Sequence, residues 1–158
     1  MAAASPFRRG LGRHSRIKQG RDFARVRREG QRAVQGCLIA NWQPLQPSSN
    51  SRVGVVVSSK IGGSVQRSRV RRLLREAFRL HQYDLAQPLD LVLVARRSIA
   101  GQPFDGVERD FLTVLRKAGL LSPHALDLLG EEIVAFLNGK RGLKLTGGKA
   151  LRYEMEDG

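Results

Sequence analysis

Four arginines in the middle of the chain are spaced so that they could bind a phosphate backbone. They recur at every fourth residue and so fall on one flank of a helix: Arg67, Arg71, Arg75 and Arg79. Glu76 is the only acid between residues 65 and 80, so the helix alone cannot neutralise the row. Like charges at this spacing repel, and the guanidinium fork matches phosphate oxygens. A solvated charged face is the ordinary alternative, but the row predicts a polyanionic partner, with nucleic acid first.

The row needs a helix to position it, and the surrounding sequence predicts one from Val65 to Leu80. The glycines of the segment 60–63 favour a turn, and the Ser64 hydroxyl could cap the free backbone N–H groups of the first turn. Arg72 lies beside the row on this helix, whereas Arg69 points toward the edge of the apolar arc. Apolar residues at helical spacing predict the buried face: Val70, Leu73, Leu74, Ala77 and Leu80.

The stretch from Ser51 to Phe78 resembles the signature region of bacterial ribonuclease P protein components. That region is a strand, a glycine turn with a lysine, and a helix that carries the motif R-N-R-x-K-R-x-x-R-E. Here the motif reads RSRVRRLLRE, starting at Arg67. Ser68 replaces the usual Asn, Arg71 replaces the usual Lys, and Gly63 stands where Asn is common. Ser68 lacks a carboxamide that can donate and accept together, and its effect on the usual contact is left open.

The resemblance implies a protein subunit that helps a catalytic RNA to remove the 5′ leader from precursor tRNA. In that family the RNA subunit carries out the hydrolysis with Mg²⁺, and the protein binds both RNAs and lowers the Mg²⁺ requirement. Contacts to the catalytic RNA are then expected at Ser58, Lys60, Arg67, Ser68, Arg69, Arg71, Arg72 and Arg75. Contacts to the leader are expected at Arg16, Phe23, Ile39 and Asn41. One protein per RNA subunit is the expected stoichiometry.

The leader site of the family is a cleft between the first helix and the sheet. Such a cleft holds single-stranded RNA by stacking bases on aromatic rings and by following the phosphates with cations. Phe23 matches an aromatic position of the family, but Arg27 and Asn41 stand where other members often have Phe or Tyr. We therefore expect this cleft to rely more on charge and hydrogen bonds. Without the resemblance, helical spacing alone would favour a core position for Phe23.

The order of the elements predicts an α+β fold, an α/β sandwich with a small mixed sheet. Helices are expected over residues 20–30, 65–80 and 105–119, and strands over 34–43, 52–58 and 90–95. The apolar run 52–58 is expected in the centre of the sheet, and 44–50 is expected as a hairpin connection. Asp105 and Glu108 are spaced as a capping box for the last helix, which Gly119 would end. The resemblance adds a left-handed β-α-β crossover, against the usual rule.

The 158 residues carry a formal net charge of +14, which favours polyanion binding by one domain with extensions. Residues 15–121, the part the resemblance covers, are the expected RNA-binding domain. Residues 1–14 are expected to form a basic flexible tail, and residues 122–158 an extension with a short helix opened by Ser122-Pro123 and a flexible end. The role of the extension is left open. No apolar run is long enough to span a membrane, so a cytoplasmic protein without a membrane partner is expected.

No group of residues predicts an active site or a metal site in the protein itself. The three histidines lie far apart in sequence, Cys37 is a lone cysteine, and no E-x-K follows Asp90 to complete a nuclease-like set. We therefore expect no catalytic residue and no metal ligand, with Mg²⁺ held mainly by the RNA subunit. Two other interpretations stay open: a structural RNA-binding protein without a processing role, and a DNA-binding protein with the arginine helix in a groove.

Overall fold

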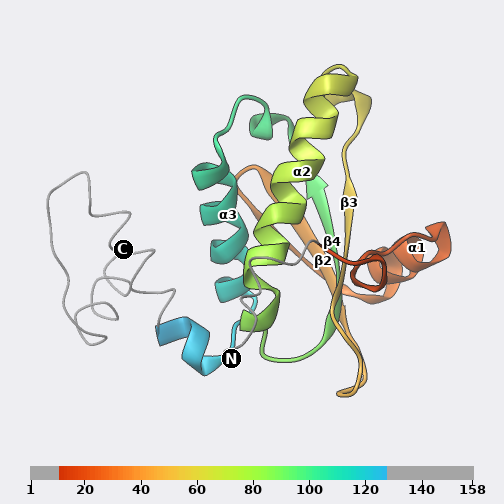
Figure 1. Ribbon diagram of the computed structural model, residues 1–158, viewed down its shortest axis with the longest axis vertical. Coiled ribbons are helices and arrows are strands. Elements are labelled where there is room, and N and C mark those ends of the chain that lie inside the picture. Colours follow the sequence, from red (N-terminus) through yellow and green to blue (C-terminus); the bar gives the residue numbers. More distant parts are fainter. Residues whose placement is uncertain (1–10, 128–158) are drawn as a thin grey trace, which may run out of the picture.

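The computed structural model, which describes residues 11–127, has a four-stranded sheet with helices on both faces (Figure 1). Helices α2 and α3 cover one face, and α1 covers the other. The elements are α1 (Gly20–Glu29), β1 (Gln31–Gln35), β2 (Leu38–Pro44), β3 (Arg52–Val56), α2 (Ser64–His81), β4 (Leu89–Ala95) and α3 (Phe104–Lys117). This is the α+β sandwich with a small mixed sheet that the sequence predicts.

The strands lie in the order β1-β2-β4-β3. Strands β1 and β2 are antiparallel, as are β2 and β4, whereas β3 and β4 are parallel and are joined through α2. The left hand of this crossover stays a prediction from the resemblance. Beyond β3, the Ile17 N–H donates to the Val53 carbonyl at 2.9 Å, so the segment before α1 partly covers that sheet edge.

Alternating residues of the strands form two apolar cores, one on each face of the sheet. The larger core packs β2 and β4 side chains such as Leu38 and Leu91 against α2 and α3. The smaller core packs Ile17 and Val26 on Val92, with partly buried apolar neighbours around them. The period of two along each strand thus separates the α2 face of the sheet from the α1 face.

The single strand predicted over residues 34–43 is wrong: the segment belongs to a hairpin of β1 and β2. The chain turns at Gly36, where φ is 52°, a left-handed conformation that suits glycine. A Cβ at this position would also collide with the Asp110 carboxylate, which accepts the Cys37 N–H at 3.0 Å. Because α3 supplies this carboxylate from far along the chain, the alternation of residues 34–43 alone does not reveal the turn.

The connection after β2 is not the predicted hairpin, because β4 lies between β2 and β3. The central place predicted for residues 52–58 is also wrong, since β3 is the last strand of the sheet and Val55 and Val56 are only half-buried. The central apolar strand is β4, in which every residue except Val94 is buried. Both segments read as continuous apolar runs, so hydropathy does not rank them.

The predicted limits of α2 and α3 agree with the structure to within two residues, but their caps differ. Gly63, and not Ser64, precedes the first helical residue of α2, and its N–H donates to the Gln66 side chain at 3.1 Å. The capping box predicted for α3 is wrong as well. Pro103 precedes that helix, and the Glu108 carboxylate contacts His81 of α2. A partner from another helix has replaced the local one.

The end of α3 matches its prediction. Gly119 has φ of 73°, and its N–H donates to the Arg116 carbonyl at 3.1 Å. The Leu120 N–H donates to the Leu115 carbonyl at 2.9 Å, which completes a Schellman motif. The glycine therefore ends the helix by a conformation that other residues adopt at a cost.

The chain after α3 is fastened to the segment that precedes β4. The Ala86 N–H donates to the Leu120 carbonyl, and the Ser122 N–H donates to the Asp84 carbonyl, both at 2.8 Å. The Ser122 hydroxyl accepts the Ala125 N–H at 3.1 Å, so Ser122 caps the next turn of helix as predicted. The rest of the predicted extension, and the first ten residues of the predicted N-terminal tail, lie outside the described residues.

Candidate nucleic-acid interface

Helix α2 turns one apolar face to the sheet and to α3. Val70, Leu74 and Ala77 are buried there as predicted, whereas Leu73 and Leu80 are only half-buried. Phe78 and His81, which the periodicity did not select, complete the buried face. The burial of this face fixes the rotation of α2 and so leaves the arginine flank toward solvent.

The arginine row crowds positive charge along the outer side of α2. Arg72 is exposed, and Arg67, Arg71 and Arg75 are half-buried. The pKa of Arg75 is lowered, first by desolvation and then by the charges of Arg16 and Arg71. Like charges therefore face one another on this surface, an arrangement that an anion would relieve.

Arg79 is the exception in the row because Glu76 neutralises it. The Arg79 Nε donates to Glu76 Oε1 at 2.8 Å and its Nη2 donates to Oε2 at 2.5 Å, a two-point pair. This hydrogen bond lowers the pKa of Glu76. The one acid of the helix thus cancels the last arginine only, and the charge of the row is concentrated from Arg67 to Arg75.

A hollow of about 400 Å³ opens beside the row, and Arg16 lies in its wall with Arg72 and Arg75. We expected Arg16 to contact the leader together with Phe23. The structure separates Arg16 from Phe23. Arg16 and Ile17 are neighbours in an extended segment, so their side chains point to opposite faces of the sheet. Ile17 enters the core on the α1 face, and Arg16 lies on the α2 side.

The other expected RNA contacts lie around the start of α2, and some of them are held by hydrogen bonds within the protein. Ser68 is exposed and lines the same hollow, and Lys60 is exposed in the turn before the helix. The Ser58 hydroxyl accepts the Lys60 N–H at 3.3 Å and so caps this turn. Arg69 is exposed, but its Nη2 donates to the Gln102 carbonyl at 2.8 Å, which holds it toward the loop before α3.

The remaining leader candidates gather on the opposite face of the sheet, beside α1. Ile39 and Asn41 alternate with the residues of β2 that enter the larger core, and Ile39 is half-buried while Asn41 is buried. The Phe23 ring packs on the backbone of Gly54, where a Cβ would lie only 2.5 Å from the ring. Gly54 therefore gives Phe23 its place, and the ring is a half-buried member of the smaller core.

A buried carboxylate, Asp90, holds two arginines at one end of this face, a feature that the sequence did not predict. Arg25 Nη2 donates to Asp90 Oδ2 at 2.6 Å, while Arg52 Nε and Nη2 donate to the same carboxylate at 2.8 and 2.7 Å. Asp22 adds a longer pair to each arginine. A lone acid at the start of an apolar strand is the available signal, because a buried charge needs partners.

Two other buried titratable groups have structural surroundings. His81 lies between Asp84 and Glu108, with contacts of 3.1 and 2.7 Å from its ring nitrogens. Desolvation lowers the pKa of His81, but the two carboxylates outweigh it and the net pKa is raised. Burial and the nearby Asp110 raise the pKa of Cys37 to about 12, so its thiol stays protonated. Within residues 11–127, no His, Cys, Asp and Glu cluster is arranged to hold a metal ion, and no helix is long and apolar enough to cross a membrane.

Comparison with known proteins identifies the family. The family model for ribonuclease P matches residues 11–119. The chain belongs to the ribonuclease P protein family. The ribonuclease P protein component of Syntrophomonas wolfei is 33% identical over 73% of this chain and 96% of the relative. That of Clostridium novyi is 35% identical over 70% and 98%.

Solved ribonuclease P proteins share the fold. The Staphylococcus aureus protein superposes with a TM-score of 0.63 at 24% identity, covering 68% of this chain and 98% of its own. The Thermotoga maritima protein gives 0.59 at 24% identity, covering 65% and 96%. The resemblance inferred from the segment 51–78 is thus confirmed for the family and for the fold.

In this member of the ribonuclease P family, the motif residues lie on one helix, but their side chains point in different directions. Arg67, Arg71 and Arg75 follow one flank of α2, Ser68 lines the hollow beside it, and Arg69 leans toward the loop before α3. The motif therefore covers more of the surface than a single stripe. The departure at Ser68 falls on an exposed position, so it changes the surface chemistry and not the packing.

Proposed function

We propose that this chain is the protein component of ribonuclease P and assists the RNA subunit in the endonucleolytic removal of the 5′ leader from precursor tRNA. The observation that carries the proposal is the arginine flank of α2, where positive charges crowd one another on a surface fixed by burial of the opposite face. Membership of the family gives this surface its partner, the ribonuclease P RNA.

The proposal divides the work between protein and RNA. Hydrolysis belongs to the RNA subunit, which also holds most of the Mg²⁺, and one protein binds per RNA subunit. Two carboxylates are in keeping with this division, because buried Asp90 is occupied by two guanidinium groups and Glu76 by a third. A basic protein lowers the Mg²⁺ requirement by replacing diffuse cations that the paired polyanions would otherwise need.

The two faces of the sheet suit two different RNA contacts. The arginine flank of α2, with Ser58 and Lys60 in the turn before it, faces the RNA subunit. The α1 face of the sheet takes the leader. Phe23 of α1 and Ile39 of β2 are both half-buried on this face. Arg16 lies with the arginine flank and in this proposal binds the RNA subunit. Because the surfaces are on opposite sides of one sheet, both contacts can form together.

The proposed setting is the cytoplasm, where precursor tRNA is processed in bacteria. A structural RNA-binding protein without a processing role would share the basic surface, but the family match over residues 11–119 favours the processing subunit.

Cleavage of a precursor tRNA by a bacterial ribonuclease P RNA at low Mg²⁺ tests the proposal. The reaction is run with RNA alone, with RNA and this protein, and with protein alone. Stimulation only in the mixture is the expected result. Tight RNA binding without stimulation would support the structural role, and cleavage by the protein alone would contradict the division of work.

A further inference from the structure

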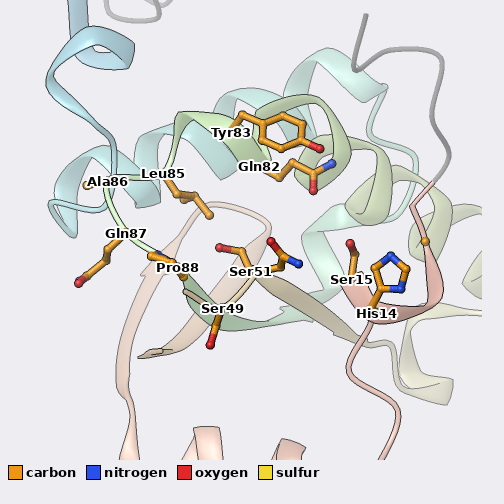
Figure 2. Close-up of a pocket in the computed structure, with 12 residues that line it drawn as sticks. His14, Ser15, Ser49, Ser51, Gln82, Tyr83, Leu85, Ala86, Gln87 and Pro88 are labelled. Atoms are coloured by element: carbon orange, nitrogen blue, oxygen red, sulfur yellow. The ribbon is translucent and has the colours of Figure 1, made fainter. Parts of the chain in front are cut away.

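A second hollow, of about 460 Å³, opens where α2 ends, and it has no role in the function proposed above (Figure 2). We call it the polar pocket. Gln82 and Tyr83 lie on one side of it and face Ser49 and Ser51 across the opening, with His14 and Ser15 at one end. Three separate stretches of chain therefore build it: the segment before α1, the loop between β2 and β3, and the turn between α2 and β4. Its volume lies in the range of pockets that hold small ligands.

The chemistry of the polar pocket differs from that of the arginine flank. Among the residues that the structure describes, no Lys, Arg, Asp or Glu lines it. Its polar side chains are the amides of Asn50, Gln82 and Gln87, several hydroxyls, a histidine and Tyr83, a residue that is 67% exposed. Neutral amides and hydroxyls donate and accept hydrogen bonds, and an exposed ring offers a flat apolar surface. This combination suits a flat, neutral, polar group and does not suit a phosphate.

The polar pocket and the hollow beside the arginine flank are lined by neighbouring residues of the same two segments. Leu11 and Arg16 line the arginine hollow, while the residues between them, including Gly12 and Ser15, line the polar pocket. The same holds at the end of α2, since Arg79 lines the hollow beside the arginine flank and Gln82, just after the helix, lines the polar pocket. The charged hollow and the polar pocket therefore lie next to each other along these segments, so neighbouring nucleotides of one strand could occupy them.

We propose that the polar pocket holds one unpaired base of the RNA whose phosphates lie on the arginine flank of α2. This inference rests on the proposed function, because it takes the arginine flank as an RNA-binding surface. Unpaired bases are recognised by stacking on aromatic rings and by hydrogen bonds to their edges. Tyr83 supplies the stacking surface, and Gln82 with the loop residues Asn50 and Ser51 supplies the edge contacts. The Gln82 amide nitrogen already donates to the Arg79 carbonyl at 3.2 Å, which orients the amide.

Substitutions of Tyr83 test the stacking, since an exposed side chain can be changed without loss of the core. Binding to a bacterial ribonuclease P RNA is measured over a range of salt concentrations. Tyr83→Ala should weaken binding by about tenfold, the loss of one stacked base, whereas Tyr83→Phe should stay within about twofold. The salt dependence should not change in either variant, because a neutral ring displaces no counterion. Leu126→Ala, which removes another exposed apolar side chain outside the pocket, is the matched control.

Chemical probing of the bound RNA tests the base itself. Dimethyl sulfate reacts with the base-pairing edges of unpaired adenines and cytosines, and a carbodiimide reacts with those of unpaired uracils and guanines. The wild-type protein and Tyr83→Phe should protect one unpaired base that Tyr83→Ala leaves reactive. Equal affinity and equal protection for all three proteins would overturn the inference, as would an equal loss on a fully paired RNA.

A parallel arginine variant separates this inference from the function on which it rests. Arg71→Ala with Arg75→Ala should flatten the salt dependence of binding. If it does and Tyr83→Ala matches the wild type, the polar pocket is not a base site although the arginine flank binds RNA. If the arginine variant keeps the wild-type salt slope, the arginine flank is not the RNA surface, and both proposals are overturned.

Discussion

Replacing Asp90 by Asn should destabilise the protein strongly, because this carboxylate is fully buried and bound by two guanidinium groups. The change keeps the shape of the side chain and removes its charge. Three hydrogen bonds of 2.6 to 2.8 Å lose their charged acceptor, and the amide nitrogen has no acceptor where a guanidinium now faces it.

The size of the stability loss depends on the burial of the Asp90 carboxylate and on the partial exposure of its two arginine partners. Removing one partner of a buried ion pair costs about 3–5 kcal/mol. The Arg25 and Arg52 side chains are 34% and 29% exposed, so the released cations regain part of their hydration. We therefore expect a loss of about 2–3 kcal/mol in the free energy of unfolding. With a urea dependence of about 1.5 kcal/mol per M, the midpoint falls by about 1–2 M.

Equilibrium urea unfolding, followed by circular dichroism, measures this loss. Asp22→Asn is the matched control, since it removes the same charge from the same arginines but at contacts of 3.4 and 3.8 Å from a less buried side chain. Its loss should stay below about 1 kcal/mol. Equal midpoints for the two variants would refute the reasoning that burial gives Asp90 its effect.

Three further predictions concern RNA binding and pH. The double variant Arg67→Ala, Arg71→Ala should weaken RNA binding and reduce its salt dependence by about two counterions, as measured by titration at several salt concentrations. The free energy of unfolding should fall as pH rises above about 6.5 and through the raised pKa of His81, because Glu108 stabilises the protonated form of His81. Denaturant midpoints measured at several pH values show this fall, and His81→Gln should remove it. Phe23→Ala should reduce affinity for precursor tRNA more than for mature tRNA, by about 1–3 kcal/mol for a stacked base.

Each of these predictions has a control. Arg116→Ala with Lys117→Ala removes the same charge at the end of α3, and an equal change in salt dependence would mean that α2 acts through net charge alone. His124→Gln replaces an exposed histidine, and a fall with pH that persists in His81→Gln would contradict the role of His81. Equal affinity losses for the two tRNAs would mark Phe23 as a core residue, whose ring serves only to pack on the sheet.

The sequence predicted those parts of the fold and site that depend on local periodicity. Helix α2, its arginine flank, the buried strand β4 and the glycine end of α3 all follow from residues within one element. The family motif added a partner for the flank. The sequence also set Arg69 apart from the row, but its contact with the Gln102 carbonyl involves a loop that no pattern in α2 indicates.

The missed features depend on residues far apart in the chain. The turn at Gly36 is set by a carboxylate of α3, and the expected cap Glu108 is taken by His81. The resemblance assigned Arg16 to the leader; the segment's pairing with β3, which decides the direction of each side chain, is not visible in its own sequence, so the sequence did not indicate that Arg16 lies on the α2 side. The apolar runs of β3 and β4 look alike, so only the order of the sheet distinguishes an edge from a centre.

The central position of β4 has a consequence for folding during synthesis on the ribosome. Its two neighbours in the sheet, β2 and β3, are synthesised first and are paired with β4 and not with each other. A nascent chain that has not yet reached residue 95 therefore carries the basic helix α2 without a completed sheet to pack on. Sheet formation waits for a late strand that joins distant segments, a topology that slows folding and lengthens the exposure of apolar edges. During that interval, an RNA held by the arginines would meet the chain before its fold is complete.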